Sequence, residues 1–145
     1  MTSHDRAIVS TDAAALPSLS ISASLDQLPV LRSLVRTMAA HKALSMEGLS
    51  DLVLATDEAA AILIRDAVPC SVLTCAFDSR VSPAAVRVIL SASTTGEIST
   101  SASSFAWHVL ESVVDGVVLE QVRPESSGQN WAVTITLNKA LQESS

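Results

Sequence analysis

Leu49-Ser-Asp-Leu-Val-Leu-Ala-Thr-Asp-Glu-Ala-Ala-Ala-Ile-Leu-Ile-Arg-Asp-Ala67 is the most informative stretch of this 145-residue chain. Its apolar residues recur every three to four positions, which predicts a helix with one face in the core. We expect this helix to begin near Ser45 or Met46 and to end before Pro69. The core-facing residues would be Leu49, Leu52, Val53, Thr56, Ala60, Leu63, Ile64 and Ala67.

The opposite face of the same helix carries few charges. It centres on Glu58, and the surrounding residues are Leu54, Ala55, Ala61, Ile62 and Arg65. A face in contact with water is usually charged, so either another part of the protein covers this face or it lines a cleft or binding surface. The alternative is an apolar helix surface without a function, since exposed apolar residues are common. The sequence leaves these alternatives open.

The residues before this helix predict one strand and one further helix. Residues 19–23 alternate between apolar and polar side chains, which is typical of a half-buried strand. Ser24 and Asp26 then favour a helix start, and Pro29 is tolerated in a first turn. This first helix would run to about His41. Its core stripe would consist of Leu28, Leu31, Leu34, Val35, Met38 and Ala39.

The residues after it predict four more strands and a third helix. The expected strands are residues 71–77, 86–92, 117–123 and 131–137, and the last of them alternates most clearly. Residues 94–104 are rich in Ser and Thr and predict a loop. The third helix would cover residues 105–114 and bury Phe105, Val109 and Val113.

This order of elements predicts an α+β protein. We expect a two-layer α/β sandwich in which three helices cover one face of a mixed, mostly antiparallel sheet. A parallel nucleotide-binding fold would alternate strands with helices, and its glycine-rich phosphate loop is absent from the sequence. A single domain would span residues 18–140, between a flexible N-terminal arm at residues 1–17 and a C-terminal tail at residues 141–145.

The composition argues against several classes of function. The formal net charge is −6, so we expect no broad surface for nucleic acid or anionic membranes. The longest apolar run, residues 59–64, is far shorter than the roughly 20 residues of a membrane span, and residues 1–16 lack the apolar stretch of a signal peptide. Cys70 and Cys75 would point to opposite faces of one strand, which argues against a disulfide. We expect reduced core thiols, no metal site and a cytoplasmic location.

Residues 54–67 resemble the first nucleotide-site motif of the histidine-kinase, gyrase and chaperone ATPase superfamily. In the RsbW-type anti-sigma factors of that superfamily, this motif has Ser or Asp before Glu, then three small residues, then Asn. Residues 19–23 and 104–115 are also similar to these anti-sigma factors, and Phe-Ala-Trp-His-Val-Leu at residues 105–110 is similar to mycobacterial members. The resemblance covers residues 19–138 and implies the Bergerat type of ATPase fold.

The resemblance implies a nucleotide site whose motifs are degenerate in this sequence. Glu58 stands where the family has a catalytic Glu, but Ile62 replaces the Asn that helps to hold Mg²⁺, and Ile offers no oxygen ligand. The family's adenine-reading Asp has no counterpart over residues 79–114, and Ser104 and Ala106 replace glycines that approach phosphate. We therefore expect no nucleotide-binding residues and no cofactor. ATP and Mg²⁺ would be cofactors only if the family's activity survives.

Two residues of the predicted site have alternative interpretations. Glu58 is either a vestigial catalytic base or a structural residue that caps a loop or pairs with Arg65, two turns further along the helix. Arg32 lies at the edge of the first helix's core stripe, where it resembles in position an Arg through which the family contacts its sigma factor. The alternative is an Arg that only faces solvent, as we expect for Arg36 one turn later.

The resemblance implies a regulatory function. The protein would sequester an alternative sigma factor of the stress or sporulation type, and an anti-anti-sigma partner of the STAS type would release it. A homodimer formed through the first-helix region is also implied. The alternative is an active serine/threonine protein kinase of the same family, which phosphorylates its antagonist with ATP and Mg²⁺. The degenerate motifs favour the binding protein over the enzyme.

Overall fold

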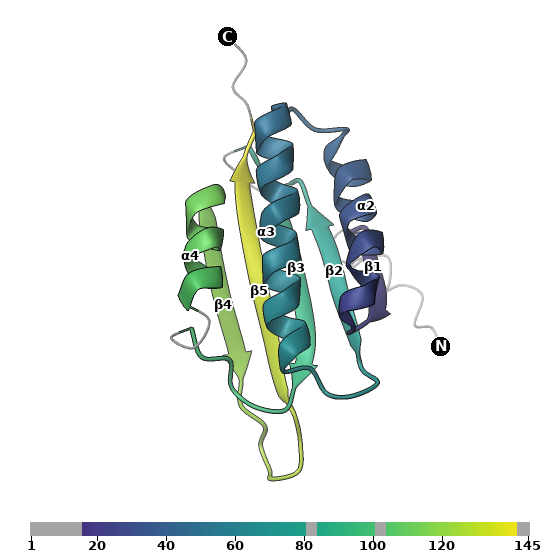
Figure 1. Ribbon diagram of the computed structural model, residues 1–145, viewed down its shortest axis with the longest axis vertical. Coiled ribbons are helices and arrows are strands. Elements are labelled where there is room, and N and C mark those ends of the chain that lie inside the picture. The colour runs from purple at the N-terminus through teal and green to yellow at the C-terminus, as the bar shows by residue number, and fades with distance from the viewer. Residues whose placement is uncertain (1–15, 81–83, 101–103, 142–145) are drawn as a thin grey trace, which may run out of the picture.

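The protein is a two-layer α/β sandwich in which three helices cover one face of a five-stranded sheet (Figure 1). The computed structural model describes residues 16–80, 84–100 and 104–141. The strands are β1 (Ser18–Ser22), β2 (Val72–Asp78), β3 (Ala85–Thr94), β4 (Gly116–Val122) and β5 (Trp131–Ala140). The helices are α2 (Leu28–Ala39), α3 (Met46–Arg65) and α4 (Ser104–Val113), and a 3₁₀ turn, η1 (Leu25–Gln27), precedes α2. The predicted α+β fold is confirmed, whereas most of the predicted arm and tail lies outside the described residues.

The sheet has the strand order β1-β2-β3-β5-β4, and its four strand pairs are antiparallel. Alternation of apolar and polar residues along β2, β3 and β5 turns one face of the sheet toward the helices and buries it. The opposite face carries small and hydroxyl-bearing side chains together with the exposed valines Val72, Val118 and Val122. Two hydroxyl pairs bridge neighbouring strands there, Ser20 with Thr74 at 3.1 Å and Ser91 with Thr134 at 3.2 Å.

The helix boundaries follow from local chemistry. Pro29 lies in the first turn of α2, where its missing N–H costs no hydrogen bond. Ser45 caps α3, because its Oγ accepts a hydrogen bond from the backbone N–H of Gly48 at 2.9 Å. Arg65 lies in the last turn of α3, where a positive charge suits the negative end of the helix dipole.

Helix α3 lies over the middle of the sheet, between α2 and α4 (Figure 1). Because neighbours cover it on three sides, more of its surface is buried than one core stripe would account for. Ala55 and Ile62, which the sequence places near Glu58 on the opposite face, are 0% and 1% exposed. Leu54 remains 43% exposed. The protein itself therefore covers part of the apolar face that the sequence left unexplained, and part of it stays on the surface.

The buried face of α4 differs from the predicted one. Leu110 is fully buried and Val114, directly after the helix, is 8% exposed, whereas Phe105 is 81% exposed. Val109 and Val113 are half-buried. On a helix, Phe105 lies on the side opposite Leu110, so it turns away from the core once Leu110 turns toward it. The prediction that Phe105 is buried is therefore wrong.

Both cysteines are free. Cys75 is buried in β2, as predicted, but Cys70 is exposed in the turn before the strand and has a left-handed backbone, with a φ of 62°. The prediction of a core thiol is therefore wrong for Cys70. In the described parts of the chain, none of the helices combines the length and the apolar character needed to cross a membrane.

Candidate functional site

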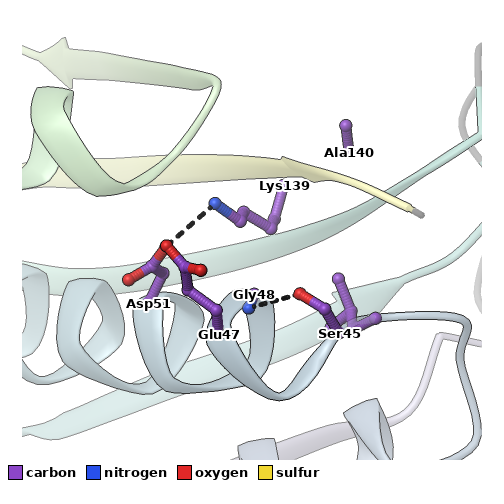
Figure 2. Close-up of a pocket in the computed structure, with 7 residues that line it drawn as sticks. Ser45, Glu47, Gly48, Asp51, Lys139 and Ala140 are labelled. Atoms are coloured by element: carbon purple, nitrogen blue, oxygen red, sulfur yellow. Dashed lines mark hydrogen bonds and ion pairs between the residues drawn. The ribbon is translucent and has the colours of Figure 1, made fainter.

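Four residues form a line along one side of α3. Asp51, Ala55, Glu58 and Ile62 follow one another at intervals of three or four residues, which places them on the same side of a helix. At the start of this line, Asp51 pairs with Lys139 of β5, with 3.3 Å between Oδ2 and Nζ (Figure 2). The line contains both residues of the nucleotide motif, Glu58 and Ile62, and faces the side of the helical layer where α4 packs.

Lys139 also fixes the end of α4. Its ammonium donates a hydrogen bond to the backbone carbonyl of Val113 at 2.8 Å, and its side chain is only 17% exposed. Next to it, the carboxylate of Asp115 accepts a hydrogen bond from the backbone N–H of Ala140 at 2.7 Å. A pocket of about 240 Å³ opens beside Lys139, with Glu47 and Gly48 of the first turn of α3 on its other side (Figure 2). These contacts tie α3, α4 and β5 together.

Ile62 is a core residue in this structure. Its side chain is 1% exposed and belongs to the same buried cluster as Leu63 and Leu110. Magnesium is bound by oxygen ligands, and Ile62 supplies none. Across the described residues, no group of three or more His, Cys, Asp or Glu side chains is placed to hold a metal ion. The residue at this position of the motif therefore does not fit Mg²⁺-ATP.

Glu58 is half-buried on α3. Its carboxylate makes no hydrogen bond or ion pair with another described residue, so the predicted pairing with Arg65 is not formed. A carboxylate without a partner is stable at this place only because part of it remains in contact with water. Glu58 thus has the exposure that a catalytic base needs, but Ile62, one turn away, does not offer the metal ligand that such a base would work with.

Ser104 and Ala106, the two positions at which the family has glycines, lie in the first turn of α4. Ala106 is half-buried and packs against the core. Before α4, the loop is fixed at Ile98 by the side chain of Gln121 on β4. The backbone N–H of Ile98 donates to Gln121 Oε1 at 2.7 Å, and Gln121 Nε2 donates to the carbonyl of Ile98 at 3.1 Å.

A groove of about 470 Å³ lies between α2 and α3, on the other side of α3 from the Asp51–Ile62 line. We call it the α2–α3 groove. Its lining includes Arg32 and Arg36 of α2, Asp57 of α3, and the apolar side chains Met46, Leu49, Val53 and Leu54. Arg32 Nε lies 2.9 Å from Oδ2 of Asp57 and 3.1 Å from Oδ1.

The sequence singles out Arg32, whose role stays a prediction, but it does not predict the surroundings of Arg32. Arg36, expected to face only solvent, is exposed but lines the same groove as Arg32. Asp57 was not predicted as a site residue, because 25 residues separate it from Arg32 and no local pattern links them. One signal in the sequence could have pointed to Asp57. It directly precedes Glu58 and lies at the border between the core stripe of α3 and the apolar opposite face of the same helix.

The fold and these side chains define a two-layer α/β protein. Its helix α3 carries the nucleotide motif but has no oxygen ligand at Ile62, and the α2–α3 groove beside it is lined by arginines and apolar side chains. No model of a protein family matches the chain. It is 31% identical over 124 residues to the anti-sigma-F factor RsbW of two strains of Mycobacterium tuberculosis, and the match covers 84% of this chain and 73% of the relative. The chain belongs to the RsbW family of anti-sigma factors.

Proposed function

We propose that this protein is an anti-sigma factor that sequesters an alternative sigma factor and is released by an anti-anti-sigma partner. The observation that carries the proposal is the 31% identity to anti-sigma-F factor RsbW over 84% of the chain. The name of that relative points to a partner of the sigma-F type. The negative net charge of −6 suits a protein that binds another protein rather than DNA.

The proposed regulation does not use nucleotide. Ile62 is buried among apolar side chains at the position where the family has a metal-binding Asn, so holding Mg²⁺ there would require both a new side chain and a repacked core. We propose that binding and release are therefore set by competition between partners. The protein would act as a homodimer in the cytoplasm, where sigma factors meet RNA polymerase.

One observation favours a second function, that of a serine/threonine kinase acting on the anti-anti-sigma partner. Glu58 stands at the position of the catalytic Glu, is half-buried, and has no ion pair with a described residue. A general base needs such a free carboxylate close to the hydroxyl it activates. Ile62 counts against this alternative, because it supplies no oxygen ligand for the Mg²⁺ that would bind the phosphates of ATP.

The test measures the binding of this protein to sigma factors. The first to be measured are sigma factors encoded next to the gene of this protein. Purified protein and sigma factor are mixed with and without Mg²⁺-ATP and followed by surface plasmon resonance, and inhibition of transcription is measured in parallel. We expect tight binding that is the same in both conditions. Absence of binding to each sigma factor of the organism contradicts the proposal. Transfer of radiolabelled phosphate to the antagonist would instead support the kinase.

Arg32 is the residue we propose to contact the sigma factor. Arg32→Ala should weaken the complex by about 2 kcal/mol, roughly 30-fold in Kd, mainly through faster dissociation. The melting temperature should change little, because the partly exposed Arg32–Asp57 pair contributes at most about 1 kcal/mol to folding. Arg123, which lies over the ring of Trp131 at 5.5 Å, is the matched control on a different surface. Equal losses for Arg32→Ala and Arg123→Ala would contradict a specific role for Arg32.

A further inference from the structure

The sheet face that the helices do not cover carries little charge in its middle. On the described strands β2, β3 and β5, the charged side chains that point to this face are Asp78 and Arg87, which lie opposite each other at one end of the sheet. Val72, Val118 and Val122 are 54%, 47% and 66% exposed on the same face. An antiparallel sheet usually turns a polar face toward water, and exposed apolar surface gathered on one face indicates a contact site.

Small hydroxyl side chains form a row across this face, at right angles to the strands. The strand register places Ser20, Thr74, Ser91 and Thr134 next to one another on β1, β2, β3 and β5. We call these four residues the hydroxyl row. On β4 the row ends at Glu120, which lies opposite Thr134.

A hollow of about 240 Å³ lies over the middle of the hydroxyl row. The side chains around it are Ala, Ser, Thr and Val, so they leave room above the backbone and offer both methyl and hydroxyl groups. Such a lining suits one aliphatic side chain of an extended segment that crosses the strands. The residues of β2, β3 and β5 that point into the hollow are Val72, Thr74, Ser91, Ser93, Ala132 and Thr134.

The chain before β1 contains a segment that is long enough to reach the hollow. The described residues begin at Leu16, and the carbonyl of Pro17 accepts a hydrogen bond from the backbone N–H of Phe77 at 2.9 Å. The hollow is about 16 Å from this point, at about 4.8 Å per strand and about 3.3 Å per residue along a strand. Ile8 precedes Pro17 by nine residues, which span about 30 Å when extended. Ile8 therefore reaches the hollow with enough chain left to pass around β1.

The charges of the segment and of the sheet match this placement. Glu120 is exposed and forms no ion pair with another residue that the structure describes. Arg6 and Ile8 are two residues apart, so they point to the same side of an extended segment and lie about 7 Å from each other. The distance from the hollow, between β3 and β5, to β4 is one and a half strand spacings, which is also about 7 Å. A segment that enters over β1 and places Ile8 in the hollow therefore brings Arg6 to Glu120.

We propose that residues 6–10 of this chain cross its own open sheet face along the hydroxyl row, with Ile8 in the hollow and Arg6 paired with Glu120. The contact is intramolecular, so the inference is independent of the proposed function. A segment joined to its site by a short linker binds at a high effective concentration, and weak contacts are then sufficient. The segment covers part of the exposed apolar surface, and any protein that binds this face has to displace it.

Disulfide formation in the full chain tests the position of Ile8. Ile8→Cys is combined with Ser93→Cys, at the edge of the hollow, in a Cys70→Ala background that removes the exposed native thiol. Equilibration in a glutathione buffer gives the effective concentration of the two introduced thiols. We expect it to be at least about tenfold higher than for Val9→Cys with Ser93→Cys, because Val9 points away from the sheet when Ile8 points toward it.

A second control combines Ile8→Cys with Ser33→Cys, because Ser33 is exposed on α2, on the helical side of the molecule. Equal effective concentrations in the three pairs would show that the segment visits both sides without docking, and would overturn the proposal. Disulfide-linked dimers in place of the intramolecular bond would put residues 6–10 on a second copy of the chain. That result would also overturn it.

The ion pair is tested by exchanging its charges. Arg6→Glu and Glu120→Arg should each lower the effective concentration of the Ile8→Cys, Ser93→Cys pair about twofold, and the double exchange should restore it. Glu125→Arg, on the exposed loop after β4, is the matched control and should leave the value unchanged. Single variants without an effect, or a double exchange without recovery, would overturn the pairing of Arg6 with Glu120.

Discussion

Ile62 shows how the same position in a motif can change its physical role. Ile62 stands at the position where the family has a metal-binding Asn. In this structure it lies in the core and is 1% exposed. An Asn side chain at this position would bury an amide, and the apolar cluster around it offers few hydrogen-bonding groups. Ile62 is therefore better understood as a residue that stabilises the packing of α3 than as a simple loss from a nucleotide site.

This role predicts that restoring the motif destabilises the protein. Ile62→Asn should lower the free energy of unfolding by about 2–4 kcal/mol, because it removes apolar contacts and buries an amide. Urea unfolding followed by circular dichroism measures the loss. Ala61→Asn, at the half-buried neighbouring position, is the control and should cost less than about 1 kcal/mol. Similar losses for the two variants would mean that position 62 tolerates a polar side chain.

The buried thiol of Cys75 makes the free energy of unfolding depend on pH in the alkaline range. Burial raises the pKa of Cys75 from 9.0 to about 12. The unfolded chain therefore loses this proton at lower pH than the folded chain, so the contribution is complete below pH 9 and is lost as the pH rises toward 12. We expect the free energy of unfolding to fall by about 2 kcal/mol between about pH 9 and pH 10.5.

The measurement is urea unfolding across this pH range, which is simplified by the absence of tyrosine from the chain. Cys75→Ala should remove most of the decrease, whereas Cys70→Ala should keep it, because Cys70 is already exposed. The same decrease in wild type and Cys75→Ala would assign the pH dependence to other groups.

At the level of helices and strands, the sequence predicted most of the structure. The two long helices and the final strand carry apolar residues over many turns or alternations, and such long patterns average out single exceptions. α4 has only ten residues, and its apolar side chains cover more than half of its circumference, so the pattern does not fix which of them faces the core. The choice between Phe105 and Leu110 depends on packing against α3, which no local pattern encodes.

The candidate site was predictable only where its residues are neighbours in sequence. Glu58 and Ile62 belong to one motif and were identified together, although their environments differ. The contact between Arg32 and Asp57 joins two helices, and its partners become visible only when α2 and α3 are packed side by side. Gln121 was missed for the same reason, because its partner Ile98 lies 23 residues away in a loop.

The loop before α4 should depend on the side chain of Gln121. Gln121→Leu would leave the backbone N–H and C=O of Ile98 without their partners, and Ile98 is only 4% exposed. We expect a loss of about 1–3 kcal/mol in stability and faster hydrogen exchange at the Ile98 amide. Gln121→Glu keeps an acceptor for that amide but loses the donor, so its exchange should be intermediate. Unchanged exchange in Gln121→Leu would show that the loop is held in another way.

At the scale of the whole molecule, the helical layer carries two surfaces with different properties. On one side of α3, Asp51, Ala55 and Ile62 are tied to or buried against neighbouring elements, so this side stabilises the fold. On the other side, the α2–α3 groove keeps apolar and charged side chains accessible. A nucleotide site at the motif would need room on the first side, whereas a surface for a protein partner would need accessible side chains such as those on the second.

This arrangement predicts that the intact protein does not respond to Mg²⁺-ATP. A ligand that binds only the folded state stabilises it by about 2.7 kcal/mol at 100 times its Kd, which raises the melting temperature of a domain of this size by about 5–10 °C. We expect no such shift at about 1 mM ATP with Mg²⁺, and no heat of binding in isothermal titration. An active ATPase of the same superfamily, measured in parallel, is the positive control.

A Kd in the low-micromolar range, about −8 kcal/mol, would contradict the prediction and make the free carboxylate of Glu58 the centre of a working site. Ile62→Asn should not produce that response either, because residues 79–114 contain no Asp to bind the adenine amino group.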